Sequence, residues 1–486
     1  MQQKSMAKNG FYKAILNIFN LIIPLLVNPY ISGLIDEPIL NTYNYIYSVL
    51  GIFLSVASFG IYNYGVREVS RVRNNPVEMN RLFSSLFLIG IISNGLTTIA
   101  YVIFAATSST QGYELAIYMV MLIQIVANVF YIEFINEAKE NYGFITVKTM
   151  MIRILYLVSI FVFVRKRTDV VPYAIVVSAT ILLNNLASFF YLKRQIRFDF
   201  THLEIRRHIP PLVVTLLMTN VEILYTTLDR VILGNTPSQT AVTEYLYPQN
   251  IVGMIAAVPL ALINVAIPRL SSYLGENNRT DYLRVLNKTI QNYMAVVIPM
   301  CLGVAVLAPE IMQLYTRGVY TYAYPVLIIS AFLRIAFSFQ SIINHLVLYV
   351  NGMERLQTAF LAAFGVLNAA TDGTLLALGL YTPATAMGTT AVIVVLYDIT
   401  AYFYTQKKLG IHYQLFSKRV LGYLLASACF ALISLGVRML HLDMWLNIIL
   451  IVVLCAGLYA LYLVLTRDSF LTEIAARLPF KKKKNA

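Results

Sequence analysis

The sequence is poor in charge, cysteine and tryptophan, and these scarcities exclude whole classes of protein. Only 12% of its 486 residues are charged, about half the share in a soluble domain. Its three cysteines, Cys301, Cys429 and Cys455, stand far apart in apolar stretches, which excludes a disulfide framework and a zinc site. We find no Walker A, HExxH, GxSxG or DxD motif. No polar loop exceeds about 20 residues, which is too short for a separate catalytic domain.

What the sequence has in abundance is apolar length. Hydrophobic residues make up 58% of the chain, and the mean hydropathy is +0.69. Reading for apolar runs gives about fourteen segments, each near the ~20 residues that a spanning helix needs. Among these segments are the fifth at 149–164, the seventh at 210–234 and the tenth at 324–350. The N-terminus has no small-residue cleavage site, so we expect the first segment to be retained. The pattern predicts an all-α integral membrane protein.

The basic residues are distributed unevenly between alternate loops. The chain has 37 Lys and Arg against 23 Asp and Glu, a net charge of +14. About thirty of the basic residues lie in one set of loops and about five in the other, which by the positive-inside rule makes both termini cytoplasmic. The surplus is thus a topology signal, and nucleic acid is not expected as a partner. Arg165, Lys166 and Arg167 fall on the predicted outer side, where they either hold an anionic glycan or are simply solvated.

A weak internal repeat divides the chain into two lobes. Tyr43, Tyr45, Gly51, Arg67 and Ser70 recur as the same residue types 202 positions later. Six helices per copy is an even number, so both copies enter the bilayer in the same direction. We therefore predict two parallel six-helix lobes, 1–205 and 206–412, with a central cleft between them. Residues 413–486 would add two helices and a basic cytoplasmic tail, Lys481 to Lys484, near anionic lipid.

Segment 210–234 carries polar side chains at helical spacing. They are Thr215, Thr219, Glu222, Thr226 and Asp229, with Arg230 beside the last. An ionisable group at the bilayer centre costs about 2.5–3.5 kcal/mol unless it faces protein or water. We therefore expect this face to point inward. Two interpretations stay open for Glu222 and Asp229: hydrogen bonding between helices, and the lining of a functional cavity.

Segment 324–350 repeats the pattern. Its polar residues are Arg334, Ser338, Ser341 and His345, at steps of 4, 3 and 4. The Arg334 guanidinium suits bidentate contact with phosphate, but a buried pair with Asp229, Glu222 or Asp372 is equally open. His345 is more simply a hydrogen-bonded packing residue than a proton carrier. Asp372 and Asp398, in the next two segments, are weaker candidates for coupling to an ion.

Many of the 34 tyrosines lie near predicted helix ends. Interfacial anchoring explains residues such as Tyr43 and Tyr45. Some tyrosines could also stack on sugars, and the sequence does not single those out.

Four stretches carry a resemblance to a known family. They are residues 28–31 (NPYI), 63–68 (NYGVRE), 228–234 (LDRVILG) and 267–271 (IPRLS). These stretches resemble bacterial polysaccharide-unit flippases of the Wzx type, and the similarity extends over nearly the whole chain. It implies membership of the multidrug/oligosaccharidyl-lipid/polysaccharide exporter superfamily. Gly33-Leu34-Ile35-Asp36 departs from the usual pattern, so the first outer loop is atypical.

The resemblance implies a plasma-membrane flippase rather than an enzyme, with no cofactor. Its substrate would be an undecaprenyl-linked oligosaccharide, a capsular or other surface-polysaccharide repeat unit, carried from the inner to the outer leaflet by alternating access. Arg334 and Arg230 are the candidates for the diphosphate, and Glu222 and Asp229 for sugar hydroxyls or a coupling H+ or Na+. Further contacts would come from Thr226, Ser338 and Ser341. Expected partners are membrane lipids and polysaccharide polymerase machinery.

Three alternatives remain at this point. A flippase for teichoic acid or for a peptidoglycan precursor of the lipid II type belongs to the same superfamily. A cation-coupled drug exporter is a second class of transporter. A membrane-embedded glycan polymerase or ligase is disfavoured, because such enzymes usually present a long outer loop with catalytic Arg or His.

Overall fold

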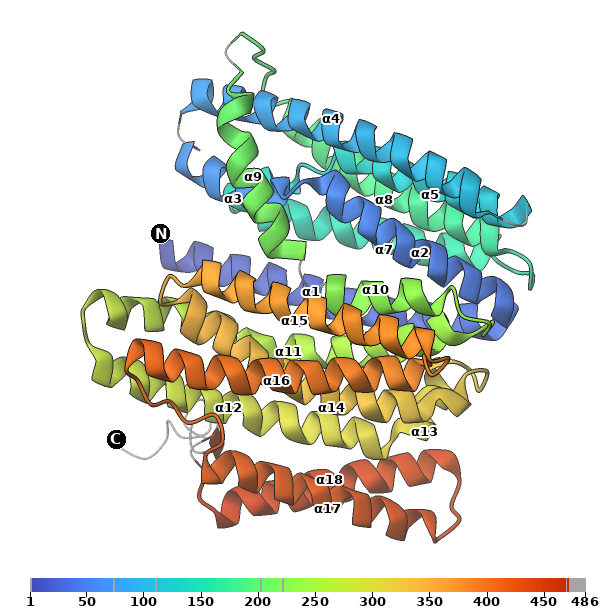
Figure 1. Ribbon diagram of the computed structural model, residues 1–486, viewed down its shortest axis with the longest axis vertical. Helices are drawn as coiled ribbons and strands as arrows, with labels where there is room; N and C mark the ends of the chain where they lie inside the picture. Colours follow the sequence, from blue (N-terminus) through green and yellow to red (C-terminus); the bar gives the residue numbers. More distant parts are fainter. Residues whose placement is uncertain are drawn as a thin grey trace. The chain divides into compact units, whose positions relative to one another are not determined.

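The computed structural model describes residues 2–72, 75–109, 112–201, 203–220, 223–468 and 470–471. All regular secondary structure in these residues is helical (Figure 1). Twelve helices are long and apolar enough to cross a membrane, and two bent helix pairs raise that number to as many as fourteen. The predicted all-α class and span number are thereby confirmed. The chain divides into two compact units, unit 1 (Met1–Thr243) and unit 2 (Glu244–Ala486), each described by itself below.

Unit 1 contains ten helices in its described residues. They are α1 (Gln2–Leu34), α2 (Glu37–Ser58), α3 (Ile61–Val72), α4 (Pro76–Ser108), α5 (Gly112–Val129), α6 (Glu133–Ala138), α7 (Tyr142–Phe163), α8 (Val170–Lys193), α9 (Ile205–Asn220) and α10 (Ile223–Leu233). Helix α5 is central, since it packs against α8, α4 and α2. Asn75 begins α4 by accepting hydrogen bonds from Val77 N and Glu78 N, and Pro76 follows at the first helical position.

Unit 2 is built around helix α14 (Tyr324–Ser341). Its elements are α11 (Ala241–Gly275, whose first three residues precede the unit), α12 (Arg279–Val306), α13 (Ala308–Tyr315), a 3₁₀ turn (Thr321–Ala323), α14 (Tyr324–Ser341), a π-helix (Ile342–Tyr349), α15 (Glu354–Ala377), α16 (Pro383–Leu409), α17 (Lys418–Arg438) and α18 (Met444–Leu465). Helix α14 packs against α12 and α16. The span that contains it is 67% buried, against 22–44% for the other spans. A polar side chain on α14 therefore faces protein on most sides.

The pair α17–α18 is attached to α12 and α13. The Tyr459 hydroxyl donates to the Ala295 carbonyl at 2.6 Å. Arg438 Nη2 donates to Glu310 Oε2 and to the Val306 carbonyl, at 2.8 and 2.9 Å. Because Glu310 is nearly buried, this ion pair fixes the end of α17 on unit 2.

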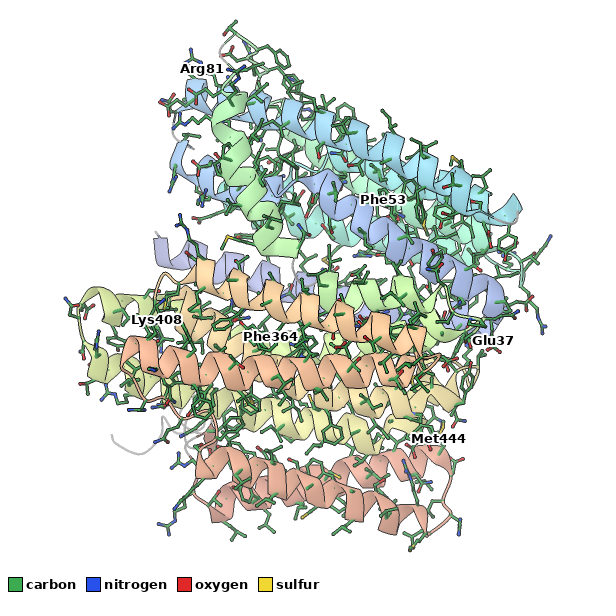
Figure 2. The ribbon with its side chains drawn as sticks, in the orientation of Figure 1. Glu37, Phe53, Arg81, Phe364, Lys408 and Met444 are labelled. Carbon is green, nitrogen blue, oxygen red and sulfur yellow. The ribbon has the colours of Figure 1, made fainter. Side chains whose placement is uncertain are left out.

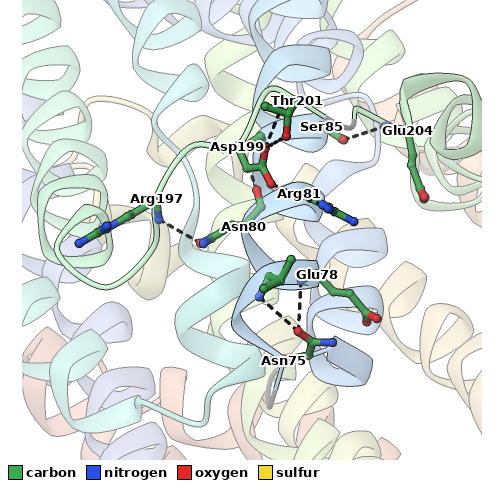
Figure 3. Close-up of polar contacts among 11 residues, drawn as sticks. Asn75, Glu78, Asn80, Arg81, Ser85, Arg197, Asp199, Thr201 and Glu204 are labelled. Atoms are coloured by element: carbon green, nitrogen blue, oxygen red, sulfur yellow. Dashed lines mark hydrogen bonds and ion pairs between the residues drawn. The ribbon is translucent and has the colours of Figure 1, made fainter.

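The loop from α8 to α9 lies on the beginning of α4 (Figure 3). Side chains of α4 accept from its backbone: Asn80 from Arg197 N at 3.0 Å, Ser84 from Asp199 N at 2.7 Å and Ser85 from Glu204 N at 3.2 Å. Arg81 Nε also donates to the Asp199 carboxylate at 3.4 Å. The loop is thus held at one end of unit 1, and Figure 2 shows Arg81 there and Glu37 at the opposite end.

Two segments differ from their predicted limits. The fifth, predicted at 149–164, is α7 and begins at Tyr142, because Lys148 is buried within the helix instead of ending it. The seventh, predicted as one helix over 210–234, is divided into Ile205–Met218 and Ile223–Leu233, which meet at 66°. The bend removes the continuous helix face on which the polar stripe of that segment was predicted.

The lobe boundary predicted near residue 205 stays a prediction. In the structure α9 and α10 fall within unit 1, and α9 packs against α3 and α4. The Tyr64 hydroxyl and His208 Nδ1 form a buried hydrogen bond of 2.7 Å between α3 and α9.

Candidate functional site

Arg334 lies about halfway along α14, half-buried, without an acidic partner. No carboxylate of unit 2's described residues comes within 4.0 Å of its guanidinium, and its buried Nε has no hydrogen-bond partner in that unit. The guanidinium lies 5.6 Å from the centre of the Phe337 ring on the same helix. An arginine in a spanning helix is costly unless something else compensates its charge.

Arg334 also has polar, uncharged neighbours. Tyr293, on the neighbouring helix α12, interacts with both Ser338 and Arg334. Ser338 donates to the Arg334 carbonyl and Ser341 to the Phe337 carbonyl, each at 2.8 Å. The two serines thus satisfy their hydroxyl protons within their own helix and keep only acceptor capacity for a ligand.

The predicted pair between Arg334 and Asp372 is not formed. Asp372 is completely buried on α15, where it accepts from Asn368 Nδ2 at 2.9 Å and from Thr389 Oγ1 at 3.3 Å. Carboxylate, amide and hydroxyl groups together are the oxygen donors that a hard cation prefers. No group of three or more His, Cys, Asp or Glu side chains suited to a metal occurs within the part of the chain that the structure describes.

Asp398, on α16, lies at the wall of an apolar cavity of about 490 Å³. The other lining residues are apolar, among them Phe332 and Phe339 of α14. The carboxyl group is 5% exposed, and its Oδ1 has no hydrogen-bond partner among the described residues. A charged carboxylate in such surroundings is strongly disfavoured, so a proton or a cation would be needed to neutralise it.

His345 does not continue the polar stripe of α14. It lies in the π-helix that follows Ser341, and its side chain is exposed, whereas Ser338 is 1% exposed. The wider π turn changes the direction of each later side chain relative to an α-helix. The predicted alignment of His345 with Arg334 at α-helical spacing is therefore wrong.

The remaining predicted residues belong to unit 1. Asp229 is completely buried on α10, Thr226 is partly buried one turn before it, and Arg230 Nη2 donates to Thr227 Oγ1 at 3.1 Å. Glu222 lies outside the described residues. The predicted residues thus form two sets, one on α10 and one on α14 to α16.

The sequence did not reveal a buried ionic cluster in unit 1. Lys148 Nζ donates to Glu133 Oε2 at 2.9 Å and to Ser188 Oγ at 2.7 Å, and the Ser188 hydroxyl donates to Glu133. The Lys148 and Glu133 side chains are 6% and 10% exposed. Because Lys148 directly precedes the predicted segment 149–164, the sequence alone counts it as a loop charge. The only indication in the sequence is that the 142–147 stretch before it is itself largely apolar.

Arg153 lies near the middle of α7. It lines a cavity of about 120 Å³ with Thr149, Tyr156, Thr180 and Asn184. Its side chain is exposed, and no carboxylate of the described residues approaches within ion-pair distance. Unit 1 therefore also presents a spanning-helix arginine without an acidic partner.

The basic cluster at 165–167 is arranged around two acidic residues. The Asp169 carboxylate accepts from Arg165 N and Lys166 N at 2.9 and 2.8 Å, and these hydrogen bonds hold the pKa of Asp169 below its usual range. Arg167 approaches Asp36 at 4.0 Å with 81% of its side chain exposed. The solvated interpretation accounts for these contacts.

Unit 2 also holds a large apolar cavity of about 700 Å³ between α12 and α18. Its lining includes Met300, Val304, Phe430, Ile451 and Cys455. A cavity of this size and lining can take a hydrocarbon chain.

Comparison with known proteins gives one family and one fold. Residues 6–274, more than half of the chain, match the family model described as "Polysaccharide biosynthesis protein". No curated protein matches the sequence. Among solved structures, the lipid II flippase MurJ in an inward closed conformation is similar with a TM-score of 0.74 and 14% identity, over 95% of this chain and 99% of that one.

Two multidrug transporters have the same fold over less of the chain. The Vibrio cholerae MATE transporter VcmN is similar with a TM-score of 0.57 and 15% identity, over 85% of this chain and 99% of that one. An inward-facing MATE transporter of the MOP superfamily gives 0.59 and 11%, over 81% and 94%. At these identities the similarity establishes the fold, which is that of the superfamily expected from the sequence.

Proposed function

Because the chain belongs to the polysaccharide biosynthesis protein family, we propose that it is a flippase for an undecaprenyl-linked oligosaccharide. The substrate is a capsular or other surface-polysaccharide repeat unit, carried from the inner to the outer leaflet by alternating access. Family and fold together favour transport over enzyme catalysis. The protein lies in the bacterial plasma membrane with both termini cytoplasmic, and a polysaccharide polymerase receives the product.

The observation that carries this proposal is the uncompensated guanidinium of Arg334. A diphosphate entering a partly dehydrated site needs cationic hydrogen-bond donors, and a guanidinium offers them in bidentate geometry. The substrate phosphate would supply the counter-charge that the described residues do not. Arg230 of α10 is the second candidate for the diphosphate. Arg153 is a third, because it lies near the middle of the spanning helix α7 without an acidic partner among the described residues.

The other site residues take roles that follow from their chemistry. Asp229, Glu222, Ser338 and Ser341 accept from sugar hydroxyls, and Thr226 accepts from or donates to them. Asp372, with Asn368 and Thr389 beside it, supports a coupling Na+. Asp398 supports a coupling H+, because its apolar cavity disfavours an uncompensated charge. His345 is the weakest coupling candidate, since it lies on the exposed side of the π-helix.

The polyprenyl chain stays in lipid or enters the apolar cavity beside α18. That cavity has a volume of about 700 Å³. The cavity lies between α12 and the pair α17–α18. These two extra helices would thus help to hold the polyprenyl chain, which a lobe of six helices without them could not do in this way.

A second candidate is a flippase for a lipid II type precursor or for teichoic acid. It is favoured by the similarity to MurJ, which covers 95% of this chain, whereas the MATE structures cover 81–88%. The family match favours the polysaccharide substrate instead. A drug exporter is the least supported of the three.

The experiment is a translocation assay in proteoliposomes. Undecaprenyl-diphosphate oligosaccharide is placed in both leaflets, and the fraction that an added glycosidase can reach is followed over time. The wild type should bring nearly all of the substrate within reach, whereas empty liposomes should stop at the outer-leaflet fraction. Arg334→Ala should be slow, and Arg355→Ala, which removes an exposed arginine at the start of α15, should behave as wild type.

The outcome also separates the candidates. Movement of lipid II with no movement of the repeat unit would replace the first proposal with the second. Movement of neither lipid, with protein correctly folded, would refute both.

The proposed orientation is checked separately by reporter fusions. Fusions at Glu276 should report the cytoplasm and fusions at Arg317 the outside. The reverse result at either position would overturn the orientation.

A further inference from the structure

A polar cavity lies at the end of unit 1 where α2 and α5 begin and where α4 and α10 end. Its volume is about 460 Å³, within the range of small-molecule sites. The lining residues are Asn41, Thr42, Tyr45, Ile46, Phe104, Ser108, Glu114, Tyr118, Val231, Gly234 and Asn235. None of them belongs to the site proposed above. Figure 1 shows α2, α4 and α5 reaching this same end of the unit.

The lining offers both hydrogen-bond donors and acceptors. Asn41 Oδ1 is occupied by Thr243 N and Thr243 Oγ1 at 3.0 and 3.3 Å, so Asn41 offers its amide nitrogen. Thr42 donates to the Pro38 carbonyl and therefore offers an acceptor. The Tyr118 side chain is 2% exposed, and its hydroxyl has no partner among the described residues. A buried hydroxyl without a partner indicates a missing ligand or water.

Aromatic rings form the other part of the lining. Tyr118 is arranged edge-to-face with Phe104, with the ring centres 6.2 Å apart. Tyr45 interacts with Asn235 and lies against Gly234, where an added Cβ would collide with its ring. The Tyr45 ring is thereby fixed between α2 and α10. Rings beside alternating donors and acceptors suit a sugar, which has both apolar C–H faces and hydroxyl groups.

Glu114 is the one ionisable carboxylate among the described lining residues, and no Lys, Arg or His accompanies it. A negative charge in the lining disfavours a uronic acid or a phosphate and accepts hydroxyl or amino groups. We propose that this cavity binds one neutral or amino-bearing sugar ring of the glycan. The inference rests on the proposed function and deepens it by naming the class of sugar.

The predicted orientation puts this end of unit 1 outside the cell. The cavity would then hold a sugar ring of the repeat unit on the side to which it is delivered. A weak site there can retain the glycan briefly without preventing its release.

The test is binding of methyl glycosides to the purified full-length protein in nanodiscs, followed by saturation-transfer NMR. The probes are methyl N-acetylglucosaminide, methyl glucoside and methyl glucuronide. The two uncharged probes should bind, and the glucuronide should bind about tenfold more weakly. Glu114→Gln should remove that difference. The control Glu37→Gln, at the same end of α2 but outside the cavity, should leave it unchanged.

Tyr118→Phe tests whether a loss of binding can occur without misfolding. Its hydroxyl makes no hydrogen bond to the described residues, so its removal should not lower the melting temperature. It should nevertheless weaken binding of the uncharged probes several-fold, as should Gly234→Ala by displacing the Tyr45 ring.

The inference and the proposed function fail in different ways. If the protein translocates the lipid-linked glycan but binds no methyl glycoside, or binds all three equally in every variant, the sugar site is refuted and the flippase stands. If the probes bind as expected and no lipid is translocated, the flippase is refuted, and the cavity remains a sugar site.

Discussion

Lys148 in unit 1 and Arg334 in unit 2 are both cations inside spanning helices, but only one has a counter-charge. Lys148 is held by Glu133 and Ser188, at 2.9 and 2.7 Å. Arg334 has the Phe337 ring, Tyr293 and Ser338 around it, and no carboxylate of unit 2's described residues within 4.0 Å. The protein has thus satisfied one charge internally and left the other available.

The difference separates a structural charge from a binding charge. A buried pair whose partners satisfy each other stabilises the fold only as long as both remain, because a single survivor is an uncompensated buried charge. An unpaired cation in a span is tolerated when a ligand or water supplies the compensation. Removal of each residue should therefore affect different properties of the protein.

The largest effect on stability is expected at the paired charge. Lys148→Met leaves Glu133 buried and alone, which should lower the free energy of unfolding by about 3–5 kcal/mol. The measurement is denaturant unfolding in detergent micelles. Lys148→Met combined with Glu133→Gln removes both charges and should recover most of the loss. A single variant as stable as wild type would show that the pair is not structural.

At Arg334 the effect should fall on transport. Arg334→Ala should slow translocation about 10–100-fold, since each charge-assisted hydrogen bond to phosphate contributes about 1.5–3 kcal/mol. Its unfolding free energy should change by less than about 1 kcal/mol, because no carboxylate of unit 2's described residues is left alone. Arg334→Lys should restore only part of the rate, as an ammonium keeps the charge but not the planar fork. If Arg334→Ala lost as much unfolding free energy as Lys148→Met, the distinction between a structural charge and a binding charge would fail.

An intermediate effect is expected at Arg438, whose pair with Glu310 is only partly buried. The side chains are 36% and 12% exposed. Arg438→Ala should cost about 1–3 kcal/mol of unfolding free energy, since it leaves Glu310 without its donor and the Val306 carbonyl with only the Ser434 hydroxyl. The same unfolding assay measures it, with Arg355→Ala as the control. If Arg438→Ala lost as much unfolding free energy as Lys148→Met, the degree of burial would not determine how much each ion pair stabilises the protein.

The smallest effect is expected at the exposed loop between α8 and α9. Hydrogen bonds from Thr201 and from Arg81 hold the pKa of Asp199 below its usual range. A carboxyl whose pKa is lower in the folded state contributes stability above its unfolded-state pKa, and that contribution is lost as the pH falls through the folded-state value. Protection of the Asp199 amide from hydrogen exchange should therefore decline only in acid.

Arg81→Ala should reduce that protection slightly at neutral pH as well. Arg71→Ala, which removes a surface pair with Glu68 on α3, is the matched control and should not change it. Equal protection at all pH values in the wild type would contradict the role of the Asp199 carboxylate.

The sequence predicted what depends on apolar length and on family motifs. The all-α class and about fourteen spans follow from long apolar runs, and the family follows from the resemblance carried by motifs such as LDRVILG at 228–234. It did not predict the 66° bend after Met218 or the π-helix at 342–349, since no proline or glycine marks either place.

The sequence also could not separate paired from unpaired charges. Lys148 and its partner Glu133 are 15 residues apart on different helices, so only the tertiary structure brings them together. Lys148 counts as a flanking charge because it directly precedes the predicted segment 149–164. Arg334 was identified because its flanks are apolar over many residues on both sides.

The most direct test of this distinction is the affinity for undecaprenyl diphosphate in nanodiscs. It should be measured for the wild type, for Arg334→Ala and for the double variant Lys148→Met with Glu133→Gln, alongside the melting temperature of each. The account predicts at least about tenfold weaker binding for Arg334→Ala at an unchanged melting temperature, and wild-type affinity for the double variant. Equal affinity of Arg334→Ala and the wild type would contradict the assignment of Arg334 to the substrate.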